Sequence, residues 1–487
     1  MNERLRFLSP EERRLPPETL GRIVGQLEEA KINLHGLLIA RGWDVELELY
    51  WAPFNERSIH RMYSTSKSIT ATAIGCLLGE GRLALDDPII KYYPDLLPAT
   101  VHPLITEMTL RDLLIMATGR STTGYRPDWP EWRSAFFTAE PESIPGTIFR
   151  YDTSGSNMLA DLVERVSAQP LLDYLRERLL DRLGFSADAD IIRGPGGIPF
   201  GGSGVLCTLR DMARIAILWN QGGMLDGEAM LPPEYVAAGR SVQIREAGQA
   251  FGNRLHMIGY GYQIWILKDG FMFSGMGAQN AYCFPEHDLV VCTIGDTQTN
   301  AQASAYIHQT LRTWLFDVPG TAGGVRPVAT TAPLPMERPT PLPEGESESP
   351  WLNRVAGRVY RLERPVGTIT AVRVDPEEDG IALSYERDGV WRTLHAGLGH
   401  ARRGPFPEAN YHGMVIGRPS GVPYDCLMHA GWIEPHKLRV LVASIGIHLG
   451  SQTWTLSFKD ERVSIDLQKT AEYFFDDFEG LGWGRAE

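Results

Sequence analysis

Arg61-Met62-Tyr63-Ser64-Thr65-Ser66-Lys67, followed by the apolar run Ile69–Leu78, is the stretch around which this chain is organised. Ser64 and Lys67 are three residues apart, a spacing that brings two side chains onto one face of a helix. The run behind them is apolar on nearly every side, which predicts a buried helix. Glu80-Gly81 is expected to end it.

This pairing of a serine with a lysine suggests nucleophilic chemistry. A helix that begins near Ser64 places its hydroxyl where backbone N–H groups lack helical partners and the dipole is positive. Burial and a positive potential both disfavour an ammonium, so Lys67 is expected to be neutral. A neutral amine beside a hydroxyl is the arrangement of a serine nucleophile with a lysine base. The alternative is a serine at a helix entry and a lysine that extends toward solvent.

Composition narrows the class of protein. The chain has 487 residues, of which 43% are hydrophobic and 22% charged, and these values predict a soluble protein of two or three domains. A net charge of −13 argues against nucleic acid or an anionic membrane as a partner. No signal peptide and no membrane-spanning run is recognisable, and the five scattered cysteines favour a reducing, cytoplasmic location. No histidine or cysteine spacing indicates a metal site, and no cofactor is expected.

The order of patterns predicts three segments. A domain of mixed helices and strands is expected over 1–318, a Pro-rich linker over 319–350, and an almost purely β domain, a small barrel or sandwich, over 351–487. Within the first domain we expect a strand hairpin over 35–51, a loop over 118–150, helices over 157–167 and 303–316, and strands over 259–265, 271–274, 280–284 and 289–294. Thr109 and Thr208 are expected to cap helices.

A serine–lysine site also needs a proton relay and an oxyanion site. Tyr151 is the relay candidate, because it lies in a turn just before a helix and is followed by small polar residues. The other interpretation is a tyrosine that anchors a turn through its hydroxyl. The N–H of Ser64 is one candidate oxyanion donor, and the stretch Ser274-Gly275-Met276-Gly277 could supply a second where glycines allow close approach to the backbone.

Several motifs together resemble one known family. They are Ser64-Thr65-Ser66-Lys67, Tyr151 after Pro145-Gly146-Thr147-x-Phe149, Ser203-Gly204-x-x-x-Thr208-x-x-Asp211, Gly259-Tyr260-Gly261-Tyr262 and Gly275-Met276-Gly277-Ala278-Gln279. Over roughly residues 15–318 the chain is similar to the serine β-lactamase/penicillin-binding-protein superfamily. The order and spacing are closest to the class C-like branch, which includes class C β-lactamases, family VIII-type esterases, D-aminopeptidases and 6-aminohexanoate-oligomer hydrolases.

The resemblance implies a fold and a set of roles. It implies an α+β architecture, a β-lactamase-like α/β sandwich with an all-helical lobe, in which Ser64 is acylated, Lys67 is its base and Tyr151 relays the proton. The C-terminal segment resembles the lipocalin-like β-barrel domains attached to some D-aminopeptidase-type members. That segment would cover a face of the hydrolase or contribute to dimerisation or access.

The chain departs from the family pattern twice. Thr153 stands where the family's Y-x-N element has Asn, and no lysine occupies the family's K-T-G element, where Phe273-Ser274-Gly275 or Ser274-Gly275-Met276 stands instead. That lysine would bind a substrate carboxylate, a charge-assisted contact worth about 1.5–3 kcal/mol. We therefore expect a serine hydrolase of small-molecule esters or amides, which could form a homo-oligomer. The alternatives are a β-lactamase or D-aminopeptidase/DD-peptidase-like enzyme, and a catalytically weak ligand-binding or sensor protein.

Overall fold

The structure is a computed structural model whose described residues are 4–120, 131–245, 257–316, 337–338, 345–409, 423–471 and 478–487. The chain separates into two compact units, Met1–Pro339 and Thr340–Glu487, called here the first and second units. Most of the linker expected over 319–350 lies outside the described residues. No helix within the described ranges is both long and apolar enough to cross a membrane.

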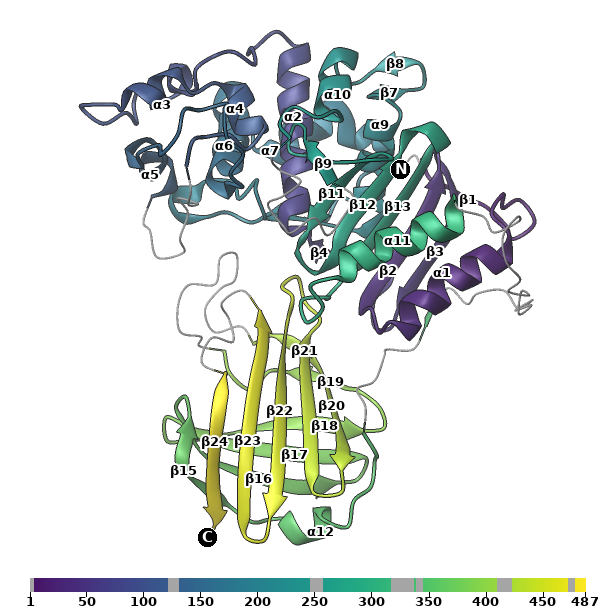
Figure 1. Cartoon of the computed structure of the whole chain (residues 1–487), viewed down its shortest axis with the longest axis vertical. Helices are drawn as coiled ribbons and strands as arrows, with labels where there is room; N and C mark the ends of the chain where they lie inside the picture. The colour runs from purple at the N-terminus through teal and green to yellow at the C-terminus, as the bar shows by residue number, and fades with distance from the viewer. Residues whose placement is uncertain are drawn as a thin grey trace. The chain divides into compact units, whose positions relative to one another are not determined.

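The first unit is built on a nine-stranded sheet, counted over the described residues. In chain order its strands are β1 (Arg6–Phe7), β2 (Leu34–Arg41), β3 (Asp44–Trp51), β9 (Met257–Tyr260), β10 (Trp265–Leu267), β11 (Phe271–Gly275), β12 (Gln279–Phe284), β13 (Leu289–Gly295) and β14 (Glu337–Arg338). Across the sheet they run β1-β3-β2-β13-β12-β11-β10-β9, with β14 beside β3 (Figure 1). The expected hairpin over 35–51 is confirmed as the antiparallel pair β2–β3.

Helices cover both faces of this sheet. On β12, Tyr282 stacks on His308 of α11 (Ala303–Leu315), whereas Cys283 lies 3.9 Å from the carbonyl of Ala216 in α9 (Leu209–Asn220). Neighbouring residues of a strand point to opposite faces, so α11 and α9 lie on opposite sides. Helix α1 (Pro17–Glu29) packs beside α11. The result is the α/β sandwich that the sequence predicts.

The central helix is buried as expected. A short 3-10 turn, η1 (Tyr63–Thr65), leads into α2 (Ser66–Gly79), whose C-cap is Glu80. On one side Trp219 of α9 donates its indole N–H to the Thr72 hydroxyl at 2.8 Å, and Tyr235 of α10 (Pro233–Gly239) donates to the carbonyl of Ala71. Helices α6 (Thr153–Ser167) and α7 (Leu171–Leu175) pack on another side. This double cover explains why the sequence of α2 has no polar stripe.

The helical lobe lies on the far side of α2 from the sheet (Figure 1). Its helices are α3 (Pro103–Glu107), α4 (Leu110–Leu114), α5 (Trp132–Thr138), α6 (Thr153–Ser167), α7 (Leu171–Leu175) and α8 (Asp181–Leu183). Thr109 and Thr208 cap α4 and α9, each within a capping box, as predicted.

Three local predictions are wrong, the first two of them in the helical lobe. The loop expected over 118–150 contains α5, and its residues 121–130 lie outside the described part. Helix α6 begins at Thr153 rather than near 157, because the Asp152 side chain accepts the N–H of Ser154 and caps the helix four residues earlier.

The single strand expected over 259–265 is instead two strands, β9 and β10. Between them the backbone leaves the sheet at Gln263, whose φ is +58° and whose N–H donates to the carbonyl of Leu114 in α4 at 2.9 Å. At this point a hydrogen bond to α4 therefore replaces the hydrogen bonds between neighbouring strands. The strands expected over 271–274, 280–284 and 289–294 and the helix over 303–316 are confirmed.

Two small sheets complete the described part of the first unit. One runs β4 (His60–Arg61), β6 (Val205–Cys207) and β5 (Asp190–Ile191), and the other pairs β7 (Met224–Leu225) with β8 (Glu228–Ala229). The first of them holds Arg61 directly before η1.

The second unit is a closed β-barrel with one short helix, α12 (Leu352–Val355). Its strands are β15 (Tyr360–Val366), β16 (Ile369–Glu377), β17 (Gly380–Arg387), β18 (Val390–Leu398), β19 (Arg402–Pro405), β20 (Asp425–Glu434), β21 (Lys437–Ser444), β22 (Gly450–Lys459), β23 (Arg462–Ala471) and β24 (Gly480–Ala486). Pairing of β18 with β20 closes a ring of nine strands in the described part, and β19 extends from β20. The predicted all-β barrel is confirmed.

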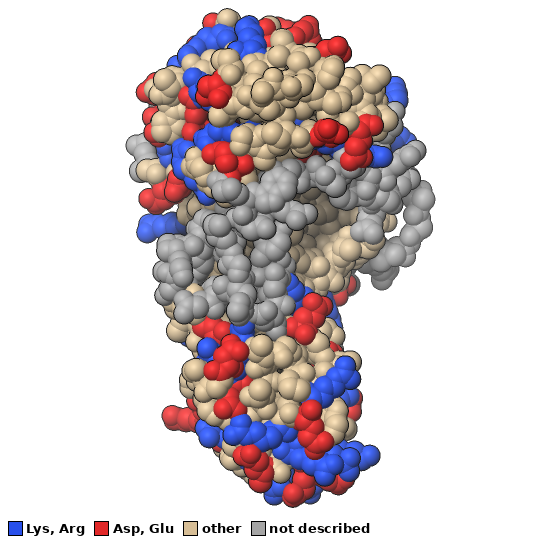
Figure 2. All heavy atoms as spheres, turned by 90° about the vertical axis from the view of Figure 1, so that its left-hand side faces the viewer, with Lys and Arg blue, Asp and Glu red and all other residues tan. Residues whose placement is uncertain are grey.

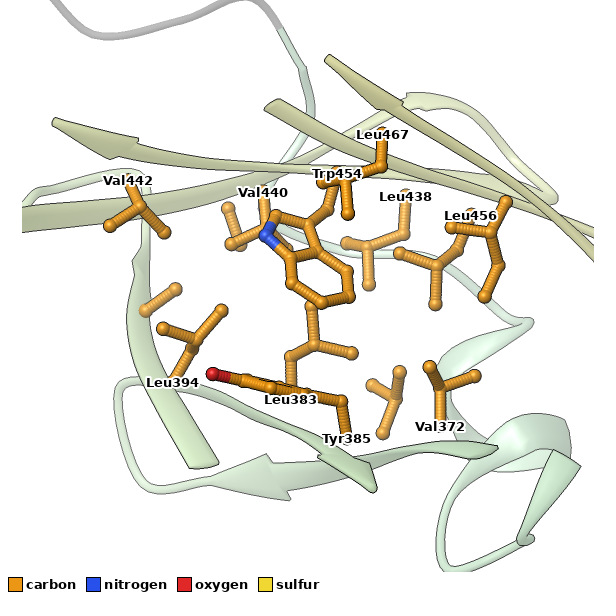
Figure 3. Close-up of a cluster of buried hydrophobic side chains, with 14 of the residues drawn as sticks. Val372, Leu383, Tyr385, Leu394, Leu438, Val440, Val442, Trp454, Leu456 and Leu467 are labelled. Carbon is orange, nitrogen blue, oxygen red and sulfur yellow. The ribbon is translucent and has the colours of Figure 1, made fainter. Parts of the chain in front are cut away.

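Apolar side chains fill this barrel. Trp454 and Tyr385 lie at its centre, with rings 5.1 Å apart, among aliphatic residues from both sides of the ring (Figure 3). Inward residues alternate along the strands, as in β21, where Leu438, Val440 and Val442 are buried. The barrel interior is therefore a packed core.

Surface charge is mixed in sign. Lys and Arg side chains are interspersed with Asp and Glu on the described surface drawn in Figure 2. No single-sign field of the kind that steers nucleic acid is visible on this face.

Candidate active site

The turn that carries Ser64 is held in an uncommon conformation. Tyr63, directly before Ser64, has φ +45°, which is rare for a bulky residue. The Thr65 hydroxyl donates to the carbonyl of Gln279 in β12 at 2.6 Å, and the Ser66 hydroxyl accepts the N–H of Val205 in β6 at 2.9 Å. These bonds fix the turn to two strands, and Ser64 remains partly exposed between them.

The amine of Lys67 lies next to the hydroxyl of Ser64. Lys67 Nζ is 3.1 Å from Ser64 Oγ and 2.6 Å from the carbonyl oxygen of Gly202. The lysine is only 1% exposed. The structure therefore brings together the two residues that the sequence pairs, with a backbone carbonyl as a third member.

Burial favours the neutral form of this lysine. Desolvation lowers the pKa of Lys67 to about 7, the charge of Asp152 opposes this shift, and the charge of Arg61 adds to it. A base with a pKa near the working pH is best suited to accept a proton. At neutral pH a substantial fraction of the amine is thus unprotonated.

Tyr151 lies against the same amine. Lys67 Nζ is 4.8 Å from the centroid of the Tyr151 ring, and this ring also stacks on Trp265 with centroids 5.8 Å apart. Trp265 in turn packs edge-on against Tyr260, and Phe149 contacts both. An aromatic cluster therefore positions Tyr151 beside Lys67.

Asp152 and Thr153 begin α6 immediately after Tyr151. The Asp152 carboxylate accepts hydrogen bonds from the hydroxyls of Thr118 and Ser154. Thr153 is buried, and its methyl group lies so close to Gly202 that a Cβ there would be 2.5 Å away. Thr153 thus lies against the glycine that accepts the hydrogen bond of Lys67.

The stretch Ser274–Gly277 lies at the end of β11 and in the 3-10 turn η6 (Met276–Ala278). Strand β11 packs against η1. A Cβ at Gly275 would be 2.3 Å from the carbonyl oxygen of Met62, so only glycine permits this approach. Gly277 has φ +78°, and the Gln279 amide donates to the Met276 carbonyl across the turn. The structure thus places this stretch beside the turn that carries Ser64.

The turn Gly201–Ser203 was missed as part of the site. A Cβ on Gly201 would be 2.2 Å from that of Ala160, and one on Gly202 would meet Thr153. Both glycines are therefore required by close packing. The adjacent Gly201-Gly202 pair in the sequence was the available signal, because such a pair allows a backbone carbonyl to reach a buried side chain.

Gln263 is a second missed residue. Its side-chain oxygen accepts the hydroxyl of Ser156, its amide donates to two carbonyls of α4, and its own carbonyl accepts the hydroxyl of Ser68. It thereby ties the β9–β10 connection, and hence Trp265, to α2, α4 and α6. No local pattern signals this role.

A metal has no evident place here. Among the described residues, no group of three or more His, Cys, Asp or Glu side chains is arranged to hold an ion.

Comparison with known proteins decides the family. The family model described as Beta-lactamase matches residues 26–309, more than half of the chain. The chain belongs to the beta-lactamase family. The predicted membership of the serine β-lactamase/penicillin-binding-protein superfamily is thereby confirmed.

Individual relatives of this beta-lactamase family member are distant. It is 27% identical over 275 residues to a 6-aminohexanoate-dimer hydrolase of Paenarthrobacter ureafaciens, covering 52% of this chain and 70% of that protein. Among solved structures it resembles a putative 6-aminohexanoate-dimer hydrolase from Bacillus anthracis, with a TM-score of 0.51, 22% identity, and coverage of 61% and 80%. A putative beta-lactamase from Bacteroides dorei gives a TM-score of 0.52, 18% identity, and coverage of 61% and 97%. These structures share its fold.

In this family member the two candidate positions for a K-T-G lysine are Phe273 and Ser274. Phe273 is buried, and its ring packs edge-on against Trp219 of α9. Ser274 is partly exposed. Neither side chain carries a charge.

Proposed function

We propose that this chain is a serine hydrolase that cleaves ester or amide bonds through an acyl-enzyme on Ser64. The observation that carries the proposal is the 3.1 Å separation of Lys67 Nζ from Ser64 Oγ, where burial lowers the pKa of the amine to about 7. An unprotonated amine at hydrogen-bond distance from a hydroxyl can accept its proton as the oxygen attacks.

The reaction has two halves. Ser64 Oγ forms a bond to the substrate carbonyl carbon, and its proton passes to Lys67. The N–H of Ser64 and an N–H of the stretch Ser274–Gly277 are the proposed donors to the oxyanion. As the bond to the leaving group breaks, the proton reaches that oxygen or nitrogen through Tyr151. Water then attacks the acyl-enzyme, releases the acid and restores Ser64.

Uncharged substrates fit the site best. Phe273 and Ser274 offer no cation for a substrate carboxylate, so we propose esters or amides that do not depend on one, with Thr153 and Ser274–Gly277 as contacts. The relative named 6-aminohexanoate-dimer hydrolase makes that dimer a second substrate to test.

Covalent labelling tests the proposal. Purified protein is treated with a fluorophosphonate probe and assayed with short-chain p-nitrophenyl esters, nitrocefin, a D-alanyl amide and the 6-aminohexanoate dimer. We expect labelling of the wild type, turnover of the esters, and loss of both in Ser64→Ala. The control is Ser241→Ala, which alters an exposed serine of the same unit.

Three outcomes contradict the proposal. Equal labelling of Ser64→Ala and wild type would remove Ser64 as the nucleophile. Turnover confined to nitrocefin or the D-alanyl amide would favour a β-lactamase or D-aminopeptidase. Labelling without turnover of any substrate would favour a ligand-binding or sensor protein.

A further inference from the structure

Arg61 contacts the Gly201–Ser203 turn from strand β4. It is 2% exposed and ends strand β4, three residues before Ser64. Its Nε donates to the carbonyl of Ser203 at 2.7 Å, and its Nη2 donates to the Ser203 hydroxyl at 3.1 Å. The guanidinium also lies over the ring of Tyr63, 4.6 Å from the centroid. Arg61 thus contacts both the turn and the residue that precedes the nucleophile.

The same turn is held from two other directions. The Thr70 hydroxyl, one helical turn after Lys67 in α2, donates to the carbonyl of Gly201 at 3.0 Å. The side-chain oxygen of Asn157 in α6 accepts the N–H of Gly202 at 2.9 Å. Between these contacts, the carbonyl of Gly202 accepts the hydrogen bond of Lys67. Because a Cβ fits at neither glycine, the turn has little room to move.

We propose that Arg61 and Asn157 are positioning residues for the reaction. Arg61 holds the turn through Ser203 and favours the neutral amine of Lys67 through its own positive charge, and Asn157 holds Gly202 without contributing charge. This inference rests on the proposed function, because it concerns how the base of that reaction is kept in place.

Because charged groups surround Lys67, substitutions of Arg61 and of Asn157 should affect the pKa of Lys67 differently. Asp152, at the start of α6, stabilises the ammonium, and Arg61, on β4, destabilises it. The neighbouring Ser64 and Tyr151 present a hydroxyl and an aromatic ring. Removal of the Arg61 charge leaves desolvation as the remaining effect that opposes Asp152, so the pKa of Lys67 should rise. Removal of the Asn157 side chain should disturb the geometry alone.

The test is the rate of fluorophosphonate acylation between pH 5 and 9. In the wild type the rate should rise with pH through a midpoint near the pKa of Lys67 and reach a plateau. In Arg61→Gln the midpoint should move up by roughly half a unit to one unit. Arg61→Lys retains the positive charge but loses the planar guanidinium that donates to both oxygens of Ser203. The midpoint should therefore equal that of the wild type, and the plateau rate should fall about tenfold. Asn157→Ala should lower the plateau at an unchanged midpoint.

Arg176→Gln is the matched control, since Arg176 also donates to backbone carbonyls in the first unit, but to those of Ser186 and Ala187 rather than to the Gly201–Ser203 turn. Its midpoint and plateau should equal those of the wild type. Thermal unfolding of each variant identifies any that fails to fold. If Arg61→Gln is such a variant, Arg61→Lys and Asn157→Ala still test the positioning role of the two residues.

The outcomes separate the two proposals. An unchanged midpoint in folded Arg61→Gln overturns the role of the Arg61 charge. Plateau rates equal to that of the wild type in Arg61→Lys and Asn157→Ala overturn the role of their hydrogen bonds to the Gly201–Ser203 turn. A wild type that is not labelled at Ser64 overturns the proposed function itself, and with it this inference. A labelled wild type with unaffected variants overturns the inference alone.

Discussion

The two units of this chain use their interiors in opposite ways. The first unit buries Lys67 beside a hydroxyl and a carbonyl, without a carboxylate in direct contact, so that its pKa is lowered to about 7. The barrel buries a charge as well, but pairs it: Arg387 and Glu408, 4% and 5% exposed, are 2.7 Å apart. An unpaired buried charge costs stability and gains reactivity, whereas a paired one is chemically inert. The contrast supports the proposal that the first unit carries the chemistry.

The largest expected effect is on Lys67 itself. Lys67→Met should lower the acylation rate at pH 8 by about 10³-fold or more, because the hydroxyl loses its base. The variant should also be more stable than the wild type at pH 7, by on the order of a few kcal/mol. The gain is partial because the Gly202 carbonyl loses its donor. Urea unfolding and probe labelling measure the two effects.

The pH dependence of that stability has a definite sign. The pKa of Lys67 is about 7 in the folded chain, against an ordinary value of 10.5. Between these values the unfolded chain binds a proton that the folded chain lacks, so the destabilisation by Lys67 is full below about pH 7 and fades as the pH rises through this window. The advantage of Lys67→Met should be greatest at pH 7 and below and should shrink as the pH approaches 10.5. An advantage that grows with pH would contradict a neutral buried amine.

The next largest effect is expected from breaking the buried ion pair of Arg387 and Glu408 in the barrel. Glu408→Ala removes the partner of Arg387 and also the acceptor of the Tyr385 hydroxyl, so it should destabilise the second unit by about 3–5 kcal/mol. The double variant Arg387→Met/Glu408→Leu should recover most of this loss. Urea unfolding followed by tryptophan fluorescence provides the measurement.

An exposed ion pair of the same barrel is the matched control. Arg358 and Glu461 are 3.0 Å apart but 45% and 73% exposed. Arg358→Ala should cost less than about 1 kcal/mol, because water screens the pair. If Arg358→Ala and Glu408→Ala cost the same, burial is not what distinguishes the two pairs.

The smallest effect concerns two histidines of the first unit. His35 Nδ1 lies 3.0 Å from His60 Nε2, and burial lowers the pKa of His60 to about 4. Both rings are therefore neutral in the fold, and the stability that depends on them is complete above about pH 6.5 and is lost as the pH falls toward 4. His60→Gln should reduce the loss between pH 6.5 and 5.5 by about 1 kcal/mol. Equal losses in thermal unfolding of variant and wild type would contradict this.

Much of the fold could be predicted from local patterns. The hairpin β2–β3, the caps Thr109 and Thr208, and the barrel strands follow from alternation, capping residues and turn residues. One error arose where a contact distant in sequence overrode the pattern, and another where a local N-cap was overlooked. Gln263 leaves the sheet to bind α4, and Asp152 starts α6 early by capping it.

For the site, the sequence alone determined that Ser64 and Lys67 share one face of a buried helix, because three-residue spacing and an apolar run are local properties. Only the tertiary structure decided that the Gly202 carbonyl meets the amine, that the Tyr151 ring lies against it, and that Arg61 and Asp152 act on its charge. These residues come from separate segments of the chain. A proton affinity is set by desolvation and by distances to charges, and both exist only once those segments have packed around Lys67.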